Sequence, residues 1–314
     1  MKPYKVIISG GGTGGHLYPA LAIADEFKSR HSTADILFVG ALGRIEMVKV
    51  PKAGYRIIGL WIDGIQRSLS LRNLMFPIKL ILSLFKSIVI LMKFKPDVVI
   101  GTGGFASGPI LFMASVFNIP TLIQEQNSYP GITNMLLSKT VKIIAVAYYG
   151  LERFFPKEKL NHTGNPIRKS IVDDKLNSAD AKAFFDQISS KPTLVVLGGS
   201  LGARNINQLI AAHLQTFQKK GLQLIWQCGS FYYDQYKKFE TDRIKIIPFV
   251  AEMDQLYAAA DMIISRSGAA TLSELCCVAL PALLVPSPNV AENHQYHNAM
   301  ALANKGAALV ITEK

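Results

Sequence analysis

Short apolar segments, many of them rich in valine and isoleucine, alternate along the whole chain with longer segments in which apolar residues recur at helical spacing. The short segments predict strands, and strands that alternate with helices are typical of parallel, doubly wound sheets. We therefore expect an α/β fold. The predicted strands are residues 4–9, 35–39, 57–60, 97–100, 120–123, 142–146 and 160–163, followed by 193–197, 222–227, 244–248, 261–265, 282–285 and 307–311.

One arrangement occurs twice, in which a predicted strand runs directly into a glycine-rich loop and then into a helix. The loops are residues 10–16 and 198–202. Glycines expose backbone N–H groups and a helix start carries partial positive charge, so such loops suit phosphates. In a chain of 314 residues, the repeat predicts two Rossmann-like domains that face each other across a cleft. We assign them to residues 1–165 and 166–314, and we expect the linker to lie after the segment Gly164-Asn165-Pro166, in the polar stretch from Ile167 to Pro192.

The composition, 49% hydrophobic and 18% charged, is that of a folded globular protein and excludes disorder as the dominant state. Cys228, Cys276 and Cys277 have no metal-binding spacing and no obvious disulfide framework. We interpret them as small buried apolar residues of a protein in a reducing compartment. A strand is predicted almost directly after Met1, which leaves no room for a signal peptide, and we expect a cytoplasmic protein.

The net charge of +12 is concentrated in the first half of the chain. Residues 1–165 contain 19 lysines and arginines against 9 aspartates and glutamates, a net charge of +10. Such a surface is compatible with nucleic acid, an anionic membrane surface, an acidic substrate or simple solubility. Aromatic residues are too sparse among the basic ones for base stacking, so we expect no nucleic-acid partner.

The segment 71–95 is rich in large apolar residues and carries Arg72, Lys79, Lys86 and Lys93 at intervals of seven. Seven residues are nearly two helical turns, so the four cations form one stripe on a helix. No uncharged run approaches the roughly 18 residues that span a bilayer. Two structures fit this pattern: a helix that lies in an anionic membrane interface, and a core helix with a lysine-rich solvent face.

The first glycine-rich loop also matches the dinucleotide fingerprint Gly-x-Gly-x-x-Gly, which is typical of oxidoreductases. That fingerprint requires an acidic residue at the end of the next strand to bind the ribose. Asp35 lies at the start of the next strand instead. The sequence therefore disfavours a nicotinamide or flavin cofactor.

A further helix start follows the predicted strand 261–265. Its small residues suit a phosphate, and Glu274 lies about one and a half turns into the helix, where its carboxylate can accept the two hydroxyls of a ribose. A capped helix with a surface glutamate is the alternative. The polar cluster 292–299, which includes Gln295, suits the recognition of sugar hydroxyls.

Seven segments follow one another over the whole chain: GGTGGHLYPALAIA, GGFASGP, EQNSYPGITN, GNPIR, GGSLGARNIN, RSGAATLSE and ENHQYHNA. Together they resemble the MurG family of membrane-associated N-acetylglucosaminyltransferases, which are inverting GT-B enzymes of glycosyltransferase family 28. The resemblance implies transfer of N-acetylglucosamine (GlcNAc) from UDP-GlcNAc to the C4 hydroxyl of undecaprenyl-pyrophosphoryl-N-acetylmuramoyl-pentapeptide. This is the lipid I to lipid II step of peptidoglycan synthesis.

The resemblance also implies a location and partners. It predicts a peripheral protein at the cytoplasmic face of the bacterial inner membrane, where an anionic membrane surface and other cell-wall synthesis proteins are candidate partners. The loops at 10–15 and 101–108 form the acceptor side in the family, and both belong to the basic half of the chain.

The family's contacts with UDP-GlcNAc can be carried over to this sequence. By resemblance, the loop of Ser200 and the helix start at Ala269 hold the diphosphate. Glu274 holds the ribose, the backbone of Val250 holds the uracil edge, and Gln295 holds the sugar hydroxyls. The full set is Thr13, Gly14, Gly15, Asn127, Arg168, Ser200, Val250, Ala269, Ala270, Thr271, Leu272, Ser273, Glu274 and Gln295.

The implied chemistry requires stabilisation of the leaving UDP and one general base. Helix dipoles and Arg168 can stabilise the leaving anion, and no Asp-x-Asp-like pair occurs in a suitable loop, so we expect neither metal nor cofactor. Inversion proceeds by a single in-line attack, for which one base suffices. His16 is the first candidate, because histidine titrates near neutral pH. If His16 only binds the donor, Glu125 is the alternative base, and a mere capping role for His16 is also open.

Two other assignments share most of these features. A related GT-B enzyme could use another lipid or sugar acceptor, and a non-catalytic, membrane-associated protein could bind the UDP-sugar. The second is expected to lose His16, Glu274 or Gln295, and all three are present. The chain ends at Lys314, whereas family members continue with further helices, so we expect the second domain to lack them.

Overall fold

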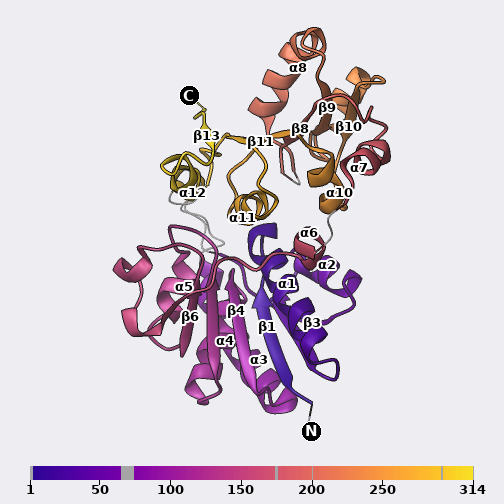
Figure 1. Ribbon diagram of the computed structural model, residues 1–314. Coiled ribbons are helices and arrows are strands. Elements are labelled where there is room, and N and C mark those ends of the chain that lie inside the picture. Colours follow the sequence, from indigo (N-terminus) through magenta and orange to yellow (C-terminus); the bar gives the residue numbers. More distant parts are fainter. Residues whose placement is uncertain (1–2, 65–73, 174–175, 200, 291–292, 314) are drawn as a thin grey trace. The chain divides into compact units, whose positions relative to one another are not determined.

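The computed structural model describes residues 3–64, 74–173, 176–199, 201–290 and 293–313 (Figure 1). The chain forms two compact units, Met1–Pro166 and Ile167–Lys314, which we call unit 1 and unit 2.

Unit 1 is built around a parallel sheet with the strand order β3-β2-β1-β4-β5-β6-β7 in its described residues. The strands are β1 (Lys5–Gly10), β2 (Asp35–Ala41), β3 (Arg56–Leu60), β4 (Val98–Gly103), β5 (Thr121–Glu125), β6 (Ile143–Val146) and β7 (Leu160–His162). The helices are α1 (Gly14–Arg30), α2 (Glu46–Lys52), α3 (Phe76–Phe94), α4 (Ser107–Val116) and α5 (Ile132–Leu137), with short 3₁₀ turns η2 (Leu151–Arg153) and η3 (Lys157–Lys159).

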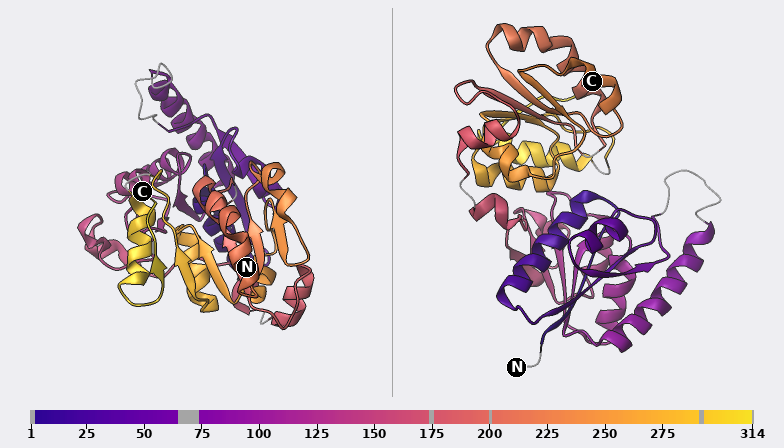
Figure 2. Two further views of the ribbon diagram at one scale, coloured as in Figure 1. Left: turned by 90° about the horizontal axis from the view of Figure 1, so that it is seen from above. Right: turned by 90° about the vertical axis from the view of Figure 1, so that its right-hand side faces the viewer.

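Helices cover both faces of the unit 1 sheet. Successive strand residues point to opposite faces, so Ile8 packs with Leu17 of α1 on one face. Ile7 packs in the same cluster as Leu91 of α3 and Leu111 of α4 on the other face. The right-hand view of Figure 2 shows α1 and α3 on opposite sides of the sheet.

Unit 2 repeats this architecture with the strand order β10-β9-β8-β11-β12-β13. Ile210 of α8 packs with Trp226 on one face of the sheet, and Leu256 of α10 and Leu272 of α11 pack with Val195 on the other. The strands are β8 (Thr193–Leu197), β9 (Gln223–Gln227), β10 (Ile244–Ile247), β11 (Met262–Ser265), β12 (Ala282–Leu284) and β13 (Leu309–Val310). The helices are α6 (Lys169–Asp173), α7 (Ser178–Phe184), α8 (Arg204–Lys219), α9 (Tyr233–Tyr236), α10 (Met253–Ala259), α11 (Ala269–Val278) and α12 (His294–Ala303), with the 3₁₀ turn η4 (Lys237–Phe239).

Every strand predicted from the sequence is present, and both sheets are parallel throughout the described residues, so the predicted α/β fold is confirmed. In each sheet the strand order reverses beside the first strand, because β1 lies between β2 and β4, and β8 lies between β9 and β11. Ligands of open α/β sheets bind outside the carboxyl ends of the strands at such switch points. The two glycine-rich loops follow β1 and β8 and therefore lie at these points.

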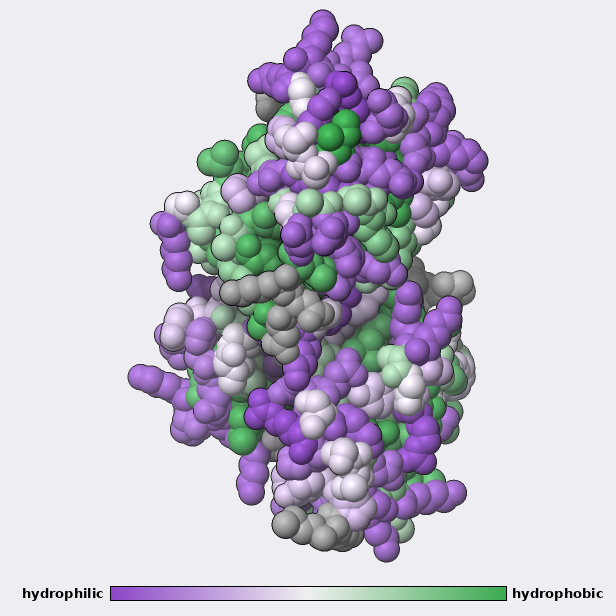
Figure 3. Space-filling view, turned by 45° about the vertical axis from the view of Figure 1, so that its right-hand side comes forward, coloured by the Kyte–Doolittle hydropathy of each residue, from purple (hydrophilic) through white to green (hydrophobic). Residues whose placement is uncertain are grey.

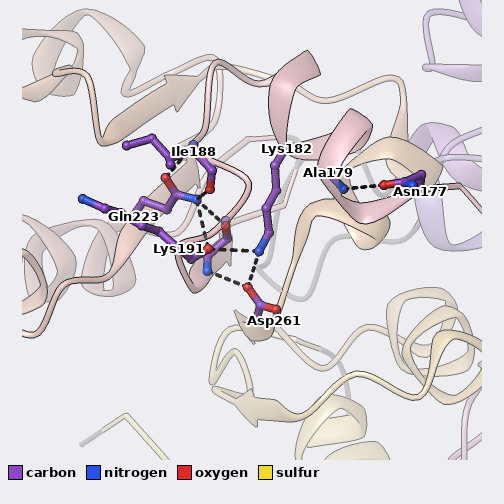
Figure 4. A network of polar contacts seen from close by, with 8 residues as sticks. Asn177, Ala179, Lys182, Ile188, Lys191, Gln223 and Asp261 are labelled. Atoms are coloured by element: carbon purple, nitrogen blue, oxygen red, sulfur yellow. Dashed lines mark hydrogen bonds and ion pairs between the residues drawn. The ribbon is translucent and has the colours of Figure 1, made fainter.

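A polar network lies at the amino-terminal ends of the unit 2 strands, opposite to the carboxyl ends (Figure 4). The ammonium group of Lys182, on α7, donates to Asp261 Oδ2 at 2.8 Å and to the carbonyl of Lys191 at 3.0 Å. The side chain of Gln223 accepts the N–H of Ile188 at 2.9 Å. These residues precede or begin β8, β9 and β11, so the network stabilises the sheet far from the glycine-rich loops.

Helix α3 directs an apolar face to solvent. Hydrophilic residues cover most of the molecular face drawn in Figure 3, whereas Phe85 and Met92 of α3 are 63% and 64% exposed. The side of α3 turned to the sheet carries Ile90 and Leu91, which are buried. The exposed apolar residues of this helix, which we call the α3 face, are Ile78, Ile81, Leu82, Phe85, Val89 and Met92.

The predicted lysine stripe lies along one flank of the α3 face. Lys79 donates to Asp63 at 2.7 Å and Lys86 donates to the carbonyl of Gly59 at 2.7 Å, while Lys93 is exposed. Arg72 lies outside the described residues. The expectation of a core helix with a lysine-rich solvent face is thus only partly right, because apolar residues occupy the centre of that face. Among the described residues, no helix is both long and apolar enough to cross a membrane.

The prediction that all three cysteines are buried is wrong for two of them. Cys228 is buried, and its burial raises the pKa of the thiol to about 11. Cys276 and Cys277 are exposed, because Leu272 and Leu275 occupy the core positions of α11.

Candidate active site

The first glycine-rich loop packs against the loop that follows β4. The N–H of Gly11 donates to the carbonyl of Gly103 at 3.3 Å, and a Cβ at Gly104 would lie 2.3 Å from the carbonyl oxygen of Gly11. Gly12 has a φ of +82°, which glycine adopts readily. Glycines in both loops therefore allow the backbones to meet at the switch point of unit 1.

Thr13, Gly14 and Gly15, the predicted donor contacts of unit 1, lie where this loop enters α1. Thr13 is the N-cap residue, and the first turn of α1 contains no acidic side chain. No acidic side chain in the first turn of α1 therefore offsets the partial positive charge of this helix start, and such a helix start suits an anionic ligand.

Glu46, which the sequence analysis did not single out, holds the glycine-rich loop in place. Its side chain is fully buried. Oε2 accepts the N–H of Gly12 at 2.8 Å, and Oε1 accepts the N–H of Ala41 at 2.9 Å. The carboxylate thus joins the loops that follow β1 and β2. An acidic residue shortly after a strand is a common pattern, so the sequence carried no specific signal for this role.

His16 lies in the first turn of α1, between the two loops of the switch point. Its Nδ1 atom is 2.9 Å from Oε1 of Gln126. Its backbone carbonyl accepts the hydroxyl of Thr102 at 2.7 Å. A Cβ at Gly103 would lie 2.7 Å from His16 Nδ1, so the imidazole ring occupies the space that this glycine leaves open.

Glu125, the alternative base, is fully buried at the end of β5. Its Oε1 accepts the backbone N–H of Asn127 at 3.0 Å and the side-chain amide of Asn127 at 3.2 Å. Its Oε2 accepts the N–H of Gly131 at 3.1 Å and the side-chain amide of Asn134 at 2.8 Å. Four donors to one carboxylate fold the loop 126–131 around it. This geometry favours an organising role for Glu125 and leaves His16 as the stronger candidate base.

In unit 2, Glu274 lies in α11 and is mostly buried, so the alternative of a surface glutamate is wrong. The hydroxyl of Tyr257 donates to its Oε2 at 2.7 Å, and Arg168 donates to its Oε1 at 3.2 Å. Burial, with the Glu274 carboxylate beside it, raises the pKa of Tyr257 well above its usual value. The structure thus brings together two predicted residues, Arg168 and Glu274. It adds Tyr257, which the sequence analysis missed because a tyrosine in an apolar helical segment carries no specific signal for this contact.

The start of α11 carries most of the other predicted donor contacts of unit 2. Gly268 is its N-cap residue, and its first turn contains no acidic side chain. The hydroxyl of Ser273 donates back to the carbonyl of Ala269 at 3.0 Å. The predicted residues in this part of the helix are Ala269, Ala270, Thr271, Leu272, Ser273 and Glu274.

Gln295, at the start of α12, lies beside the loop that leads into α11. Its Oε1 accepts the N–H of Ser287 at 2.9 Å, and its carbonyl accepts the hydroxyl of Ser267 at 2.8 Å. Val250 follows β10 and lines a cavity of about 360 Å³ together with Phe184 and Phe249. Ser200 lies outside the described residues.

No group of three or more His, Cys, Asp or Glu side chains in the described part of the chain is arranged to hold a metal ion.

The sequence profile of the glycosyltransferase family 28 N-terminal domain matches residues 6–146, and that of the family's C-terminal domain matches residues 193–314. The chain belongs to glycosyltransferase family 28. Its two parallel-sheet units and the solved structures that resemble it identify the fold as GT-B.

Similar proteins narrow this class. The chain is 55% identical over 312 residues to the "UDP-N-acetylglucosamine-N-acetylmuramyl-(pentapeptide) pyrophosphoryl-undecaprenol N-acetylglucosamine transferase" of Cytophaga hutchinsonii, covering 99% of this chain and 85% of that protein. It is 56% identical over 309 residues to the protein of the same name from Christiangramia forsetii, covering 98% and 84%. Among solved structures, MurG of Acinetobacter baumannii is similar with a TM-score of 0.75 and 27% identity, over 99% of this chain and 86% of that one.

Proposed function

We propose that this family 28 enzyme transfers GlcNAc from UDP-GlcNAc to the C4 hydroxyl of lipid-linked N-acetylmuramoyl-pentapeptide, converting lipid I to lipid II in peptidoglycan synthesis. The observation that carries the proposal is the 55% identity, over 99% of the chain, to a relative named for this transfer. The glycine-rich loops at the switch points of both sheets support it, because the reaction involves a nucleotide diphosphate and a lipid diphosphate.

Unit 2 supplies the nucleotide contacts in this proposal. Glu274 accepts the ribose hydroxyls, since each carboxylate oxygen can accept a further hydrogen bond beside those from Tyr257 and Arg168. The cavity at Val250 receives the uracil, and Gln295 binds the sugar hydroxyls. The diphosphate lies at the helix start of residues 269–273 and at the loop of Ser200. Thr13, Gly14, Gly15 and Asn127 are proposed contacts of unit 1.

The chemistry is one in-line displacement. The acceptor oxygen forms a bond to C1 of GlcNAc as the bond from C1 to the UDP oxygen breaks, and the anomeric configuration inverts. His16 takes the proton of the acceptor hydroxyl. The helix start at Ala269 and the guanidinium of Arg168 stabilise the charge on the departing UDP.

Transfer of labelled GlcNAc to a short-chain lipid I analogue tests this function. We expect product in the presence of EDTA, and a loss of about 10²–10⁴ in kcat for His16→Ala if His16 is the base. Tight UDP binding without product would contradict the acceptor assignment and support a related enzyme or a binding protein. Full activity of His16→Ala would contradict only the role of His16 as the base and would leave the proposed transfer reaction intact.

The α3 face is the proposed contact with an anionic membrane surface, which places the enzyme peripherally where its lipid substrate resides. An exposed apolar helix face with lysines on its flank can insert its side chains at the lipid interface while the cations meet anionic headgroups. In this proposal the membrane is the cytoplasmic face of the bacterial inner membrane.

Sedimentation with vesicles that contain anionic lipid tests the membrane contact. The variant Phe85→Ser/Met92→Ser should bind vesicles more weakly while keeping its fold, since both side chains are already exposed. The matched control is Leu201→Ser/Phe231→Ser, which removes two exposed apolar side chains of unit 2. Equal loss in both variants would contradict a specific role of the α3 face.

A further inference from the structure

His16 ends a chain of side-chain amides that crosses the interior of unit 1. Nε2 of Gln124 donates to Asn165 Oδ1 at 2.9 Å. The two hydrogens of Gln126 Nε2 are shared among three acceptors: Oε1 of Gln124 and two backbone carbonyls, those of Gln124 and Thr102, which each lie 2.9 Å away. Oε1 of Gln126 then faces Nδ1 of His16 at 2.9 Å.

The carbonyl partners fix the orientation of the Gln126 amide. Two backbone carbonyls can only accept hydrogen bonds, so the NH₂ group of Gln126 must face them. Turning the amide over would set its oxygen against both carbonyls inside a buried network, since Gln126 is 1% exposed. The oxygen of Gln126 therefore points to His16 and can only accept.

An acceptor opposite Nδ1 requires a proton on Nδ1. In a neutral imidazole the other nitrogen, Nε2, then carries the lone pair. The ring has little freedom to turn over, which would put Cδ2 in the place of Nδ1, because Gly103 packs so closely that a Cβ there would lie 2.7 Å from His16 Nδ1.

We propose that Gln126 is a positioning residue that holds neutral His16 with its proton on Nδ1, so that Nε2 is the atom that removes the proton from the acceptor hydroxyl. The inference rests on the proposed glycosyl transfer. Because the partner is a neutral amide, it selects the tautomer and orientation of the base without adding a charge beside it.

Nitrogen NMR of the imidazole rings tests the tautomer without any assay of activity. Protein labelled with ¹⁵N-histidine contains six such rings, and the His16 signals are those that disappear in His16→Ala. At pH 8, long-range proton–nitrogen correlations should identify Nδ1 as the protonated nitrogen of His16. A His16 ring protonated on Nε2 would overturn the proposal, and this spectrum requires no variant that alters the network.

The variant Gln126→Met removes the acceptor at similar volume. We expect the His16 signals to move toward the opposite tautomer. We also expect kcat to fall at least about tenfold, but no further than in His16→Ala, with KM for UDP-GlcNAc unchanged. Gln187→Met is the matched control, because Gln187 is a buried glutamine of unit 2 whose amide binds the carbonyl of Phe185.

The two readouts separate the possible failures. Unchanged His16 signals and full kcat in Gln126→Met would overturn the positioning role. Equal losses in Gln126→Met and Gln187→Met would assign the effect to stability and also overturn it. If the wild-type enzyme transfers no sugar, the proposed function fails and the catalytic role of Gln126 fails with it, whereas the wild-type spectrum still decides the tautomer.

Discussion

At the scale of single residues, Tyr257 orients the carboxylate of Glu274, the proposed contact to the donor's ribose. Its hydroxyl donates to Glu274 Oε2 at 2.7 Å within the core of unit 2. We expect Tyr257→Phe to weaken donor binding by about 1.5 kcal/mol, the lower end of the net contribution of a hydrogen bond to a charged group. KM for UDP-GlcNAc should then rise about tenfold with little change in kcat, measured by steady-state kinetics.

The pH dependence of this effect follows from the raised pKa of Tyr257. Because burial keeps the phenol protonated above its usual range, it remains a donor throughout neutral and mildly alkaline pH. The ratio of KM between Tyr257→Phe and wild type should therefore be the same at pH 7.5 and pH 9.5. A ratio that falls toward one at pH 9.5 would mean that the phenol has lost its proton, and would contradict the raised pKa of Tyr257. Tyr236→Phe, at a buried tyrosine packed on Trp226, is the control.

The sequence could locate the candidate site residues His16 and Glu274, but not the residues that contact and orient them. Glu274 follows a predictable helix start, and His16 follows a recognisable glycine-rich loop. Tyr257 and Gln126 gain their roles through contacts with residues 17 and 110 positions away. Such pairs depend on the folded arrangement of strands and helices, which local periodicity does not encode.

At the scale of elements, Glu46 connects the start of α2 to the glycine-rich loop. Glutamine in its place offers one acceptor oxygen to the two N–H groups, of Gly12 and Ala41, that the carboxylate binds. A buried N–H left without a partner costs about 1–3 kcal/mol. We expect Glu46→Gln to lower the free energy of unfolding by this amount in denaturant titrations, and to lower kcat at least about tenfold because the loop also carries His16.

The control for this prediction is Glu26→Gln, since Glu26 forms an exposed ion pair with Arg30 on α1. That change should alter stability by less than about 0.5 kcal/mol. An equally small effect of Glu46→Gln would mean that the loop keeps its conformation without the carboxylate.

Helix α7 supplies a second prediction at this scale. The Lys182 ammonium, with a side chain 6% exposed, joins α7 to Asp261 at the start of β11, whereas the Asp261 side chain is half exposed. We expect Lys182→Met to destabilise unit 2 by about 1–2 kcal/mol, less than for a fully buried pair, because solvent can still reach the carboxylate. Thermal unfolding measures it. Lys237→Met removes an exposed ion pair and should be close to neutral.

Periodicity predicted the elements well and their exposed faces less well. The alternation of short apolar and helical segments placed every strand, and the central strands gave the clearest signal because a strand buried on both faces must be apolar throughout. It did not establish that the centre of the solvent face of α3 would be apolar, because Phe85 and Met92 are the residue types that usually fill a core. The same limit applies to Cys276 and Cys277, which the structure leaves exposed.

At the scale of the whole molecule, the charge is uneven, with +10 of the net +12 in residues 1–165. If the membrane contact lies on unit 1, the charge of unit 1 should affect binding to anionic vesicles more than the net charge of the whole chain does. A basic residue close to an anionic surface contributes about 1 kcal/mol, and this attraction decays over a Debye length of about 10 Å at 0.1 M salt and about 3 Å at 1 M. Binding to anionic vesicles should therefore weaken as salt rises.

Variants of two pairs of exposed lysines can distinguish the effect of charge near the α3 face from the effect of net charge on vesicle binding. Lys93→Gln/Lys95→Gln removes two charges at the end of α3, and Lys219→Gln/Lys220→Gln removes two at the end of α8. At low salt we expect the first variant to bind anionic vesicles about thirtyfold more weakly than wild type, since it loses about 1 kcal/mol for each of two lysines. The second should bind as wild type does, and high salt should remove the difference between them. Equal weakening of both variants would mean that net charge, rather than the surface beside the α3 face, draws the protein to the membrane.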